Sequence, residues 1–232
     1  MRVEKLPEDN QLPLNIKQSE RHAKGYGSVV WKVLVSDKDA QERLVALKQM
    51  HRKEFSSDSE MQNSKRFYDF LKSFPGFGKF VPQTLYFQAR MSPDQKPGGY
   101  MLQDFSDGKT INSIKDDELY EDPVVVQQLL DFTLAATKII QETREKKIHK
   151  PDFGGTMRSV ITSNPRYSPN IIITKKPNKE GQRVFFVDTD IGLGERTNRT
   201  MEVTLREVGG RLQQLQLKAW QSKLERILKS KT

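Results

Sequence analysis

Hydrophobic residues change their spacing near residue 106 of this 232-residue chain, and that change limits the folds available to it. Before it, short runs rich in β-branched and aromatic residues alternate with polar turns, as in antiparallel sheets. After it, apolar residues recur every three or four positions over long stretches, as in helices. This order predicts an α+β fold with two lobes, a strand-rich lobe at 1–105 and a reduced helical lobe at 106–232.

In the first part, the runs Val29–Val35 and Leu44–Lys48 predict a hairpin, because a polar turn separates them. Residues 55–74 predict a helix, since their apolar side chains follow helical spacing. The next two apolar runs, 81–91 and 99–105, predict two further strands.

In the second part, Asp122-Pro123 predicts the start of a long helix, because proline is tolerated at the first helical position. Residues 204–228 predict another helix, bent or interrupted at Gly209-Gly210. The apolar residues of this last helix are expected to pack inside the protein rather than to bind a partner. They are Leu212, Leu215, Trp220, Leu224, Ile227 and Leu228.

Composition excludes several classes of site. The chain has no cysteine, so disulfides and thiolate metal sites are excluded, and its three histidines lack the spacing of a zinc hydrolase. No run of about 18 apolar residues is present, so we expect no membrane partner. The first residues lack the apolar core of a secretory signal, and a cytoplasmic location is therefore expected. The formal net charge of +9 favours anionic partners such as nucleotides.

Two features of the first part are typical of a phosphate-binding site. Gly25-Tyr26-Gly27 lies between predicted strands, where glycines let backbone N–H groups approach phosphate oxygens. Lys48 follows about 20 residues later on a neighbouring strand, where its ammonium group can reach the same phosphates. Each feature alone is weak, but their combination is more specific.

Two oxygen-bearing residues flank a second predicted hairpin. Asn170 stands just before the run Ile171–Ile173, and Asp188 just after the run Val184–Val187. If these runs pair through the polar segment 175–182, both side chains emerge at the same end. Magnesium prefers oxygen ligands, usually one or two from protein with the rest from phosphates and water. The pair therefore predicts a site for nucleotide-bound magnesium, although both residues are also ordinary turn formers.

The order of these elements resembles that of the protein kinase-like superfamily over roughly residues 23–194. Val45-Ala46-Leu47-Lys48 is similar to the family's Val-Ala-Ile-Lys strand, and Gly25 and Gly27 are similar to its nucleotide-covering loop. The resemblance implies a two-lobe kinase-like fold, with ATP and magnesium as cofactors. It implies that Lys48 anchors the phosphates and that Asn170 and Asp188 bind metal.

The same resemblance implies further nucleotide-binding residues. Backbone groups near Asp104 and Ser106 would hold adenine, because the segment 100–108 is similar to the strand and hinge between kinase lobes. An acidic residue on the following helix would pair with Lys48. Glu60 is the first choice for this role, and Glu54 is the alternative.

The chain also departs from the family pattern. The first glycines of the loop are missing, and Asp188-Thr189-Asp190 replaces Asp-Phe-Gly. Pro165 stands five residues before Asn170, where the family places its catalytic aspartate. Asp152 is the nearest candidate base; the alternative is that its segment is only a turn and that catalysis is lost.

These observations predict a compact, atypical phosphotransferase. The acceptor is expected to be a protein serine or threonine hydroxyl, with a small hydroxylated molecule as a close alternative. A pseudokinase that regulates a partner is the second class. A nucleic-acid partner is not expected, because no nucleic-acid-binding motif accompanies the positive charge.

Overall fold

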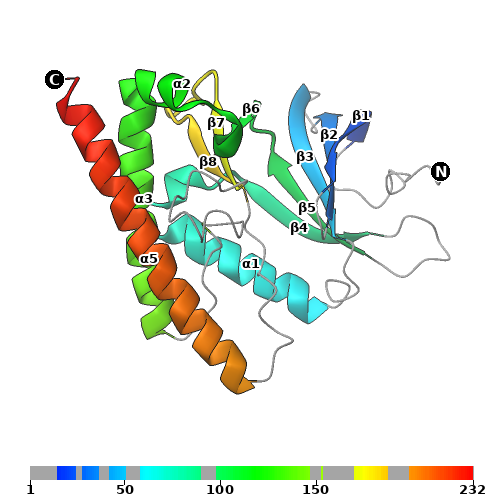
Figure 1. Ribbon diagram of the computed structural model, residues 1–232. Helices are drawn as coiled ribbons and strands as arrows, with labels where there is room; N and C mark the ends of the chain where they lie inside the picture. Colours follow the sequence, from blue (N-terminus) through cyan, green and yellow to red (C-terminus); the bar gives the residue numbers. More distant parts are fainter. Residues whose placement is uncertain are drawn as a thin grey trace. The chain divides into compact units, whose positions relative to one another are not determined.

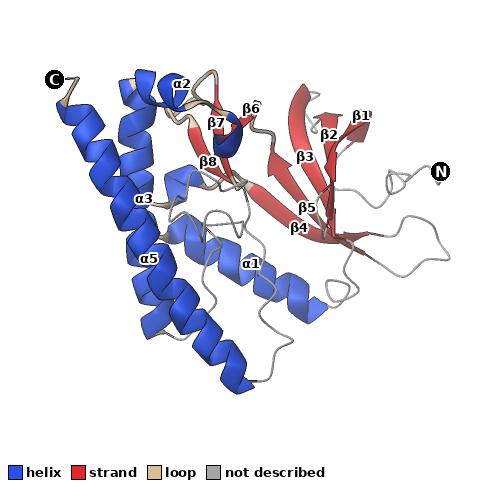
Figure 2. Ribbon diagram, viewed as in Figure 1, coloured by secondary structure: helices blue, strands red, loops and turns tan. Residues whose placement is uncertain are grey.

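The structure is a computed structural model that divides into two compact units (Figures 1 and 2). Unit 1 contains residues 1–66 and 83–105, and unit 2 contains residues 67–82 and 106–232. The structure describes residues 15–24, 28–36, 42–50, 58–89, 98–146, 153, 170–187 and 199–231. Each unit is considered separately below.

Unit 1 is built on a five-stranded antiparallel sheet, which is drawn in red in Figure 2. Its strands, in spatial order, are β1 (Asn15–Lys24), β2 (Ser28–Ser36), β3 (Glu42–Met50), β5 (Gly98–Asp104) and β4 (Thr84–Ala89). Strand β3 pairs with β2 on one side and with β5 on the other. The predicted first hairpin is therefore confirmed as β2–β3, and the predicted α+β class is confirmed for the described residues.

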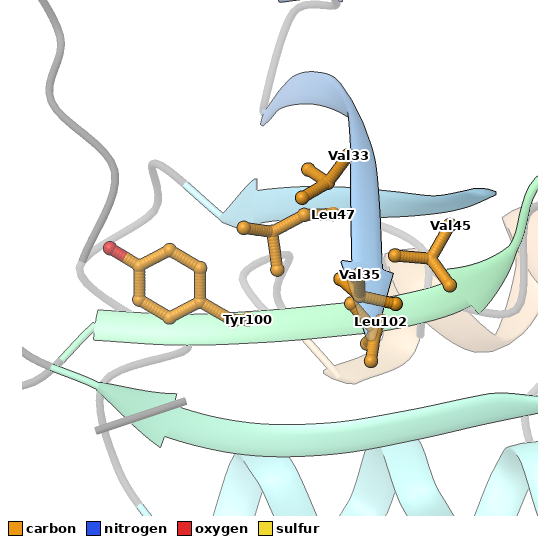
Figure 3. Close-up of a cluster of buried hydrophobic side chains, with 6 residues drawn as sticks. All are labelled: Val33, Val35, Val45, Leu47, Tyr100 and Leu102. Carbon is orange, nitrogen blue, oxygen red and sulfur yellow. The ribbon is translucent and has the colours of Figure 1, made fainter. Parts of the chain in front are cut away.

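Alternation of side chains gives this sheet a clear apolar face. Val33 lies opposite Val45, and Leu47 lies opposite Leu102, so these side chains point to the same side. They form a buried cluster with their neighbours, which Figure 3 shows in close-up. The cluster, called the aliphatic cluster below after five of its six members, consists of Val33, Val35, Val45, Leu47, Tyr100 and Leu102. Trp31 and Phe87 pack against it and remain partly buried.

Helix α1 (Asp58–Ser73) follows β3 and is the helix predicted over 55–74, of which residues 55–57 lie outside the described residues. Its last residues belong to unit 2, where Phe67 and Leu71 are buried. Lys72 Nζ donates hydrogen bonds to Gly78 O at 3.2 Å and Val81 O at 2.7 Å. These bonds hold the segment after the helix against its last turn.

Unit 2 combines helices with a small antiparallel sheet of order β6-β7-β8. The strands are β6 (Gly108–Thr110), β7 (Ile171–Thr174) and β8 (Val184–Phe186). The helices wholly within this unit are α2 (Asp116–Glu121), α3 (Pro123–Glu145) and α5 (Arg199–Lys229). Two short 3₁₀ helices, η3 (Gly78–Phe80) and η4 (Ile111–Ser113), complete the described elements of the unit.

Helices α3 and α5 lie side by side and run in opposite directions (Figure 1). Gly210 of α5 faces Ile140 near the end of α3, whereas Lys231 donates a hydrogen bond to Glu121 O just before α3 begins. We predicted that the helix is bent or interrupted at Gly209-Gly210; the interruption is ruled out, because α5 is continuous from Arg199 to Lys229. A glycine inside a helix costs about 1 kcal/mol relative to alanine, and packing against α3 offsets a cost of that size.

The apolar residues of α5 that we expected to pack inside the protein differ in their exposure. Trp220 and Leu224 are buried, as predicted. The prediction is wrong for Leu212 and Leu215, which are 37% and 63% exposed. Both leucines lie on the side of α5 that faces away from α3. The helix therefore carries apolar residues on two faces, of which only one is buried.

Among the described helices, α3 has the length and apolar composition that a membrane-crossing helix needs. Half of the relevant stretch is buried inside the protein, and Leu129, Phe132 and Ile139 on it are fully buried. The central helix of a folded core has the same composition, so this property is weak support for a membrane span.

Candidate functional site

Lys48 lies on β3 on the side of the sheet opposite the aliphatic cluster. It is placed directly across from Val30 on β2 and from Met101 on β5. Its flanking residue Leu47 belongs to the cluster, so alternation turns Lys48 and Ala46 to the other face. Lys48 is half-buried there. A half-buried lysine can present its ammonium group from an ordered strand to an anionic ligand.

The surroundings of Lys48 on this face combine buried and polar groups. Met101 is buried, and the Gln103 side-chain amide donates to Thr84 Oγ1 at 3.0 Å, also in a buried position. Lys32 lies across from Ala46, with its ammonium 5.4 Å from the centre of the Phe105 ring. Lys32 is also paired with Glu20, whose carboxylate lies 3.5 Å from its ammonium group. The face therefore carries two lysines and a carboxylate, and its polar amide is satisfied.

Asp104 and Ser106, predicted near the adenine-binding segment, differ in their hydrogen bonding. The Asp104 carboxylate accepts from Arg43 at 3.1 Å, and its backbone N–H donates to Gln83 O at 3.0 Å. Ser106 is half-buried and makes no hydrogen bond within the described residues. The backbone of Ser106 is thus the more accessible of the two for a base edge.

In unit 2, Asn170 stands at the open end of the predicted second hairpin. The pairing of β7 with β8 places Ile171 opposite Phe186, and Val187 N–H donates to Asn170 O at 2.9 Å. The hairpin prediction is therefore confirmed up to Val187. Asp188, the second predicted metal ligand, is the next residue in the sequence and lies outside the described residues.

The turn of this hairpin is held by one side chain. Asn178 Oδ1 accepts from Glu180 N at 3.0 Å and from Gln182 N at 2.8 Å. Gly181 has φ of +77°, a left-handed conformation that side chains other than glycine adopt at a cost. The polar residues that indicated a turn in the sequence thus fix its shape.

Helix α3 anchors the hairpin through Gln128. Its side-chain oxygen accepts from Arg183 N at 2.8 Å and from Val184 N at 3.2 Å, and its Nε2 donates to Gly181 O at 2.8 Å. One amide therefore satisfies three backbone groups of the hairpin. The sequence pattern contained no signal for this role, because Gln128 resembles any polar residue of an amphipathic helix.

Arg183 makes a second connection between the hairpin and α3. Its Nε donates to Thr174 O at 2.9 Å, and its Nη1 forms an ion pair with the Asp122 carboxylate. Asp122 also accepts from Val124 N at 2.9 Å and so caps α3. Burial tends to raise the pKa of Asp122, but the backbone hydrogen bonds and Arg183 together hold it below its usual value.

Five phenylalanines form the core behind this hairpin. They are Phe77, Phe80, Phe132, Phe153 and Phe186, all with at most 1% exposure. The ring centres of Phe153 and Phe186 are 5.2 Å apart, and Phe132 contacts both. Phe153 immediately follows Asp152 in the sequence, and Phe186 precedes Asp188 by two residues. The sequence analysis missed Phe153 as an anchor because it stands outside any periodic run.

Several predicted site residues fall outside the described residues. These are Gly25, Gly27, Glu54, Asp152 and Asp188. Glu60 lies on α1, as the prediction required, although only its backbone is described. Within the described part of the chain, no group of three or more acidic or histidine side chains is arranged to hold a metal ion. The roles of all these residues therefore remain predictions.

A shallow pocket in unit 2 encloses about 420 Å³, including space open to solvent. Ile114, Leu119 and Val125 supply part of its apolar wall. Two cations on its rim are already paired, Arg183 with Asp122 and Lys109 with Glu118. These ion pairs connect elements of unit 2, so the charged residues that form them have a structural role, and none of the residues lining the pocket belongs to the predicted nucleotide site.

Comparison with models of known protein families found no family that matches this chain, and comparison with curated proteins found no match.

Proposed function

We propose that this chain is an ATP- and magnesium-dependent phosphotransferase that acts on a hydroxyl group, preferably that of a protein serine or threonine. The observation that carries the proposal is the position of Lys48. The Val-Ala-Leu-Lys run occupies β3, the third strand of an antiparallel sheet, and a helix follows it. In protein kinases the phosphate-anchoring lysine is carried by the third strand, and its acidic partner by the next helix.

The β7–β8 hairpin supports the same proposal independently. Asn170 stands at its open end, and the chain continues from Val187 directly into Asp188. Kinases use one asparagine and one aspartate to hold magnesium on the nucleotide phosphates. Gln128 and the phenylalanine core hold the hairpin rigidly, as metal-binding groups require.

In the proposed reaction, the γ-phosphoryl group of ATP passes to the acceptor hydroxyl, and ADP leaves. Asp152 accepts the hydroxyl proton. Lys48 neutralises phosphate charge, and Asn170 and Asp188 would hold magnesium, which would supply further positive charge at the phosphates. Catalysis then consists mainly of positioning and electrostatic stabilisation, because phosphoryl transfer needs little covalent help from protein groups.

The test is phosphate transfer from labelled ATP, with autophosphorylation and a generic protein acceptor measured together. Lys48→Ala and Asp188→Ala should each abolish transfer. Lys17→Ala, which changes an exposed lysine of the edge strand β1, should leave it unchanged. Transfer that survives in both site variants would contradict the assignment.

ATP-dependent thermal stabilisation separates the remaining outcomes. ATP at about 100 times its dissociation constant stabilises a folded protein by about 2.7 kcal/mol. Stabilisation that Lys48→Ala removes, without any transfer, would favour the pseudokinase or a kinase for a small hydroxylated molecule. Asp152→Asn should retain this stabilisation and lose turnover; an unchanged rate would place the base elsewhere.

A further inference from the structure

Helix α5 carries two rows of residues at alternating spacings of three and four. The inner row is buried and packs on the α3 side: Gly210, Gln213, Leu217, Trp220 and Leu224. The outer row is exposed: Leu212, Leu215, Ala219 and Ser222. With 3.6 residues per turn, the two rows lie on nearly opposite sides of the helix. The packing on α3 therefore accounts for the inner row and leaves the outer row uncovered by the described residues.

The outer row begins with two exposed leucines one turn apart. Leu215 is 63% exposed, which is the highest value among the large apolar side chains described, and Leu212 is 37% exposed. In the sequence, apolar residues continue the same spacing towards the N-terminus at positions 201, 205 and 208. A repeat of this kind over three heptads is typical of a helix that packs against another helix.

Positive charge surrounds the outer row. Over the whole length of the row and beyond it, residues 201–231 contain seven basic residues and three acidic residues, a net +4 of the chain's formal +9. Arg211, Lys218 and Arg226 are exposed beside or within the row. The described residues 211–231 that are exposed include no carboxylate.

Other cations of α5 already have a structural role. Lys223 Nζ lies 3.1 Å from the Asp116 carboxylate and 4.6 Å from the centre of the Tyr120 ring. Just beyond α5, Lys231 Nζ donates to Glu121 O at 2.6 Å. Arg211 and Lys218 make no ion pair or side-chain hydrogen bond within the described residues. The acidic surface of α2 thus neutralises one side of α5 and leaves the outer side positive.

We propose that the outer row of α5 is a docking site for an acidic amphipathic helix of a partner protein. Leu212 and Leu215 would pack into the apolar stripe of the partner helix. The small residues Ala219 and Ser222 let its backbone approach closely. Glutamates or aspartates beside that stripe would pair with Arg211 and Lys218, as charges flanking a helical seam do in coiled coils.

The observations favour this occupant over three others. A second copy of the chain would bring its own Arg211 and Lys218, and like charges across a helical seam repel. A lipid surface needs a broad apolar face, but the opposite face of α5 is already buried. Nucleic acid would match the charge but offers the two leucines no apolar contact in its phosphate backbone.

This proposal does not depend on the phosphotransferase assignment, because it uses no residue of the predicted nucleotide site. It is tested with two labelled synthetic helical peptides and the full-length chain, by fluorescence anisotropy. Both peptides carry leucines at heptad core positions; one has glutamate at the flanking positions, and the other has lysine. The acidic peptide should bind, and the basic peptide should not.

Two variants test the outer row: one places a carboxylate among its leucines, and the other reverses the two flanking charges. Leu215→Asp should weaken binding of the acidic peptide at least about 10-fold, as loss of a central interface contact does. Arg211→Glu combined with Lys218→Glu should weaken it further and should create binding to the basic peptide. Both positions are exposed, and unchanged circular dichroism will show that the fold is retained.

Lys176→Glu combined with Lys179→Glu is the matched control, since it makes the same charge change on the exposed β7–β8 turn. Binding should survive in it. An equal loss in this control, or full binding by Leu215→Asp, would overturn the proposal. A chain that does not bind the acidic peptide would also overturn the proposal. If such a chain instead dimerises, binds vesicles or binds oligonucleotides in a way that depends on Leu215, the occupant of the outer row is one of the three alternatives.

Discussion

The five-stranded sheet of unit 1 and the three-stranded sheet of unit 2 are both antiparallel, but different interactions hold their strands in register. In unit 1, side chains such as Val33 and Val45 face each other within one aliphatic cluster. In unit 2, the strands of the β7–β8 hairpin pair over three positions, and Gln128 and Arg183 bind their backbone directly. A longer sheet can define its register by apolar alternation, whereas a short one needs contacts from elsewhere.

This difference bears on the magnesium site that we propose at the open end of the unit 2 hairpin. Polar contacts from α3 fix individual backbone groups, and the phenylalanine core packs against Phe186 of the strand Val184–Phe186. The aliphatic cluster of unit 1 stabilises its sheet by burying apolar surface, which has no preferred direction, whereas hydrogen bonds fix the geometry of particular groups. Substitutions in the two regions should therefore differ in size and in how far their effects extend.

Phe132→Ala should cause the largest loss of stability. Its ring is fully buried and contacts four other phenylalanines, so removal should cost about 3–5 kcal/mol in the free energy of unfolding. Hydrogen exchange should accelerate in α3, β7 and β8 but not in β2 and β3. Leu134→Ala, on the exposed side of the same helix, is the control. Equal acceleration in both sheets would contradict the independence of the two cores.

Leu47→Ala makes the corresponding change in unit 1. Leu47 is fully buried in the aliphatic cluster, and a cost of about 2–4 kcal/mol is expected. Here the faster hydrogen exchange should appear in β2, β3 and β5. Leu85→Ala removes the same atoms from a half-exposed leucine on β4 and should cost much less. Comparable costs at the two positions would show that the cluster does not define the core.

Gln128→Ala tests the polar anchoring of the β7–β8 hairpin. It leaves two backbone N–H groups of the hairpin without their acceptor, and the expected cost is about 1–3 kcal/mol. Gln127→Ala is the control, because Gln127 is exposed and bonds only to Asp131 in the described structure. If exchange in β7 and β8 is equal in the two variants, the amide of Gln128 is not an anchor.

Asp122→Asn should have the smallest effect, and that effect should depend on pH. Asparagine keeps the helix cap but loses the charge opposite Arg183, and a partly exposed ion pair contributes about 0.5–1 kcal/mol. The folded pKa of Asp122 lies below its unfolded value, so this contribution is complete above about pH 4 and disappears as the pH falls through the folded pKa. Urea unfolding of both proteins from pH 7 to pH 2 measures it.

Asp117→Asn is the matched substitution without an ion pair in the described structure. Its stability difference from the parent chain should stay near zero throughout that pH range. A difference for Asp122→Asn that does not shrink in acid would mean that Arg183 does not stabilise the carboxylate.

Much of the fold could be predicted from local sequence. Strands such as Val29–Val35 were recognisable because β-branched residues cluster there, and Asp122-Pro123 indicated the start of α3 because proline is tolerated at the first helical position. The continuity of α5 through Gly209-Gly210 could not be predicted, because packing against α3 overrides the local preference of glycine.

Part of the candidate site was also predictable, because local sequence patterns mark the strands and the positions next to them. Lys48 and Asn170 adjoin periodic runs, so the sequence placed both correctly on their elements. The anchoring roles of Gln128 and Phe153 depend on contacts between distant segments, which spacing does not record. Likewise, Leu215 has the same local pattern as buried leucines, and its exposure follows only from which side of α5 meets α3.

The long stretch of sequence between α2 and its partner residues on α5 has a consequence for synthesis. All the strands of unit 1 have been made once residue 105 has left the ribosome, so its sheet can form early. Unit 2 must wait, because Tyr120 meets its partner Trp220 only 100 residues later. Until then the apolar side of α3 that α5 covers is exposed to other nascent chains. During this interval, exposed apolar surface makes the chain more prone to aggregation than it is once α5 has packed.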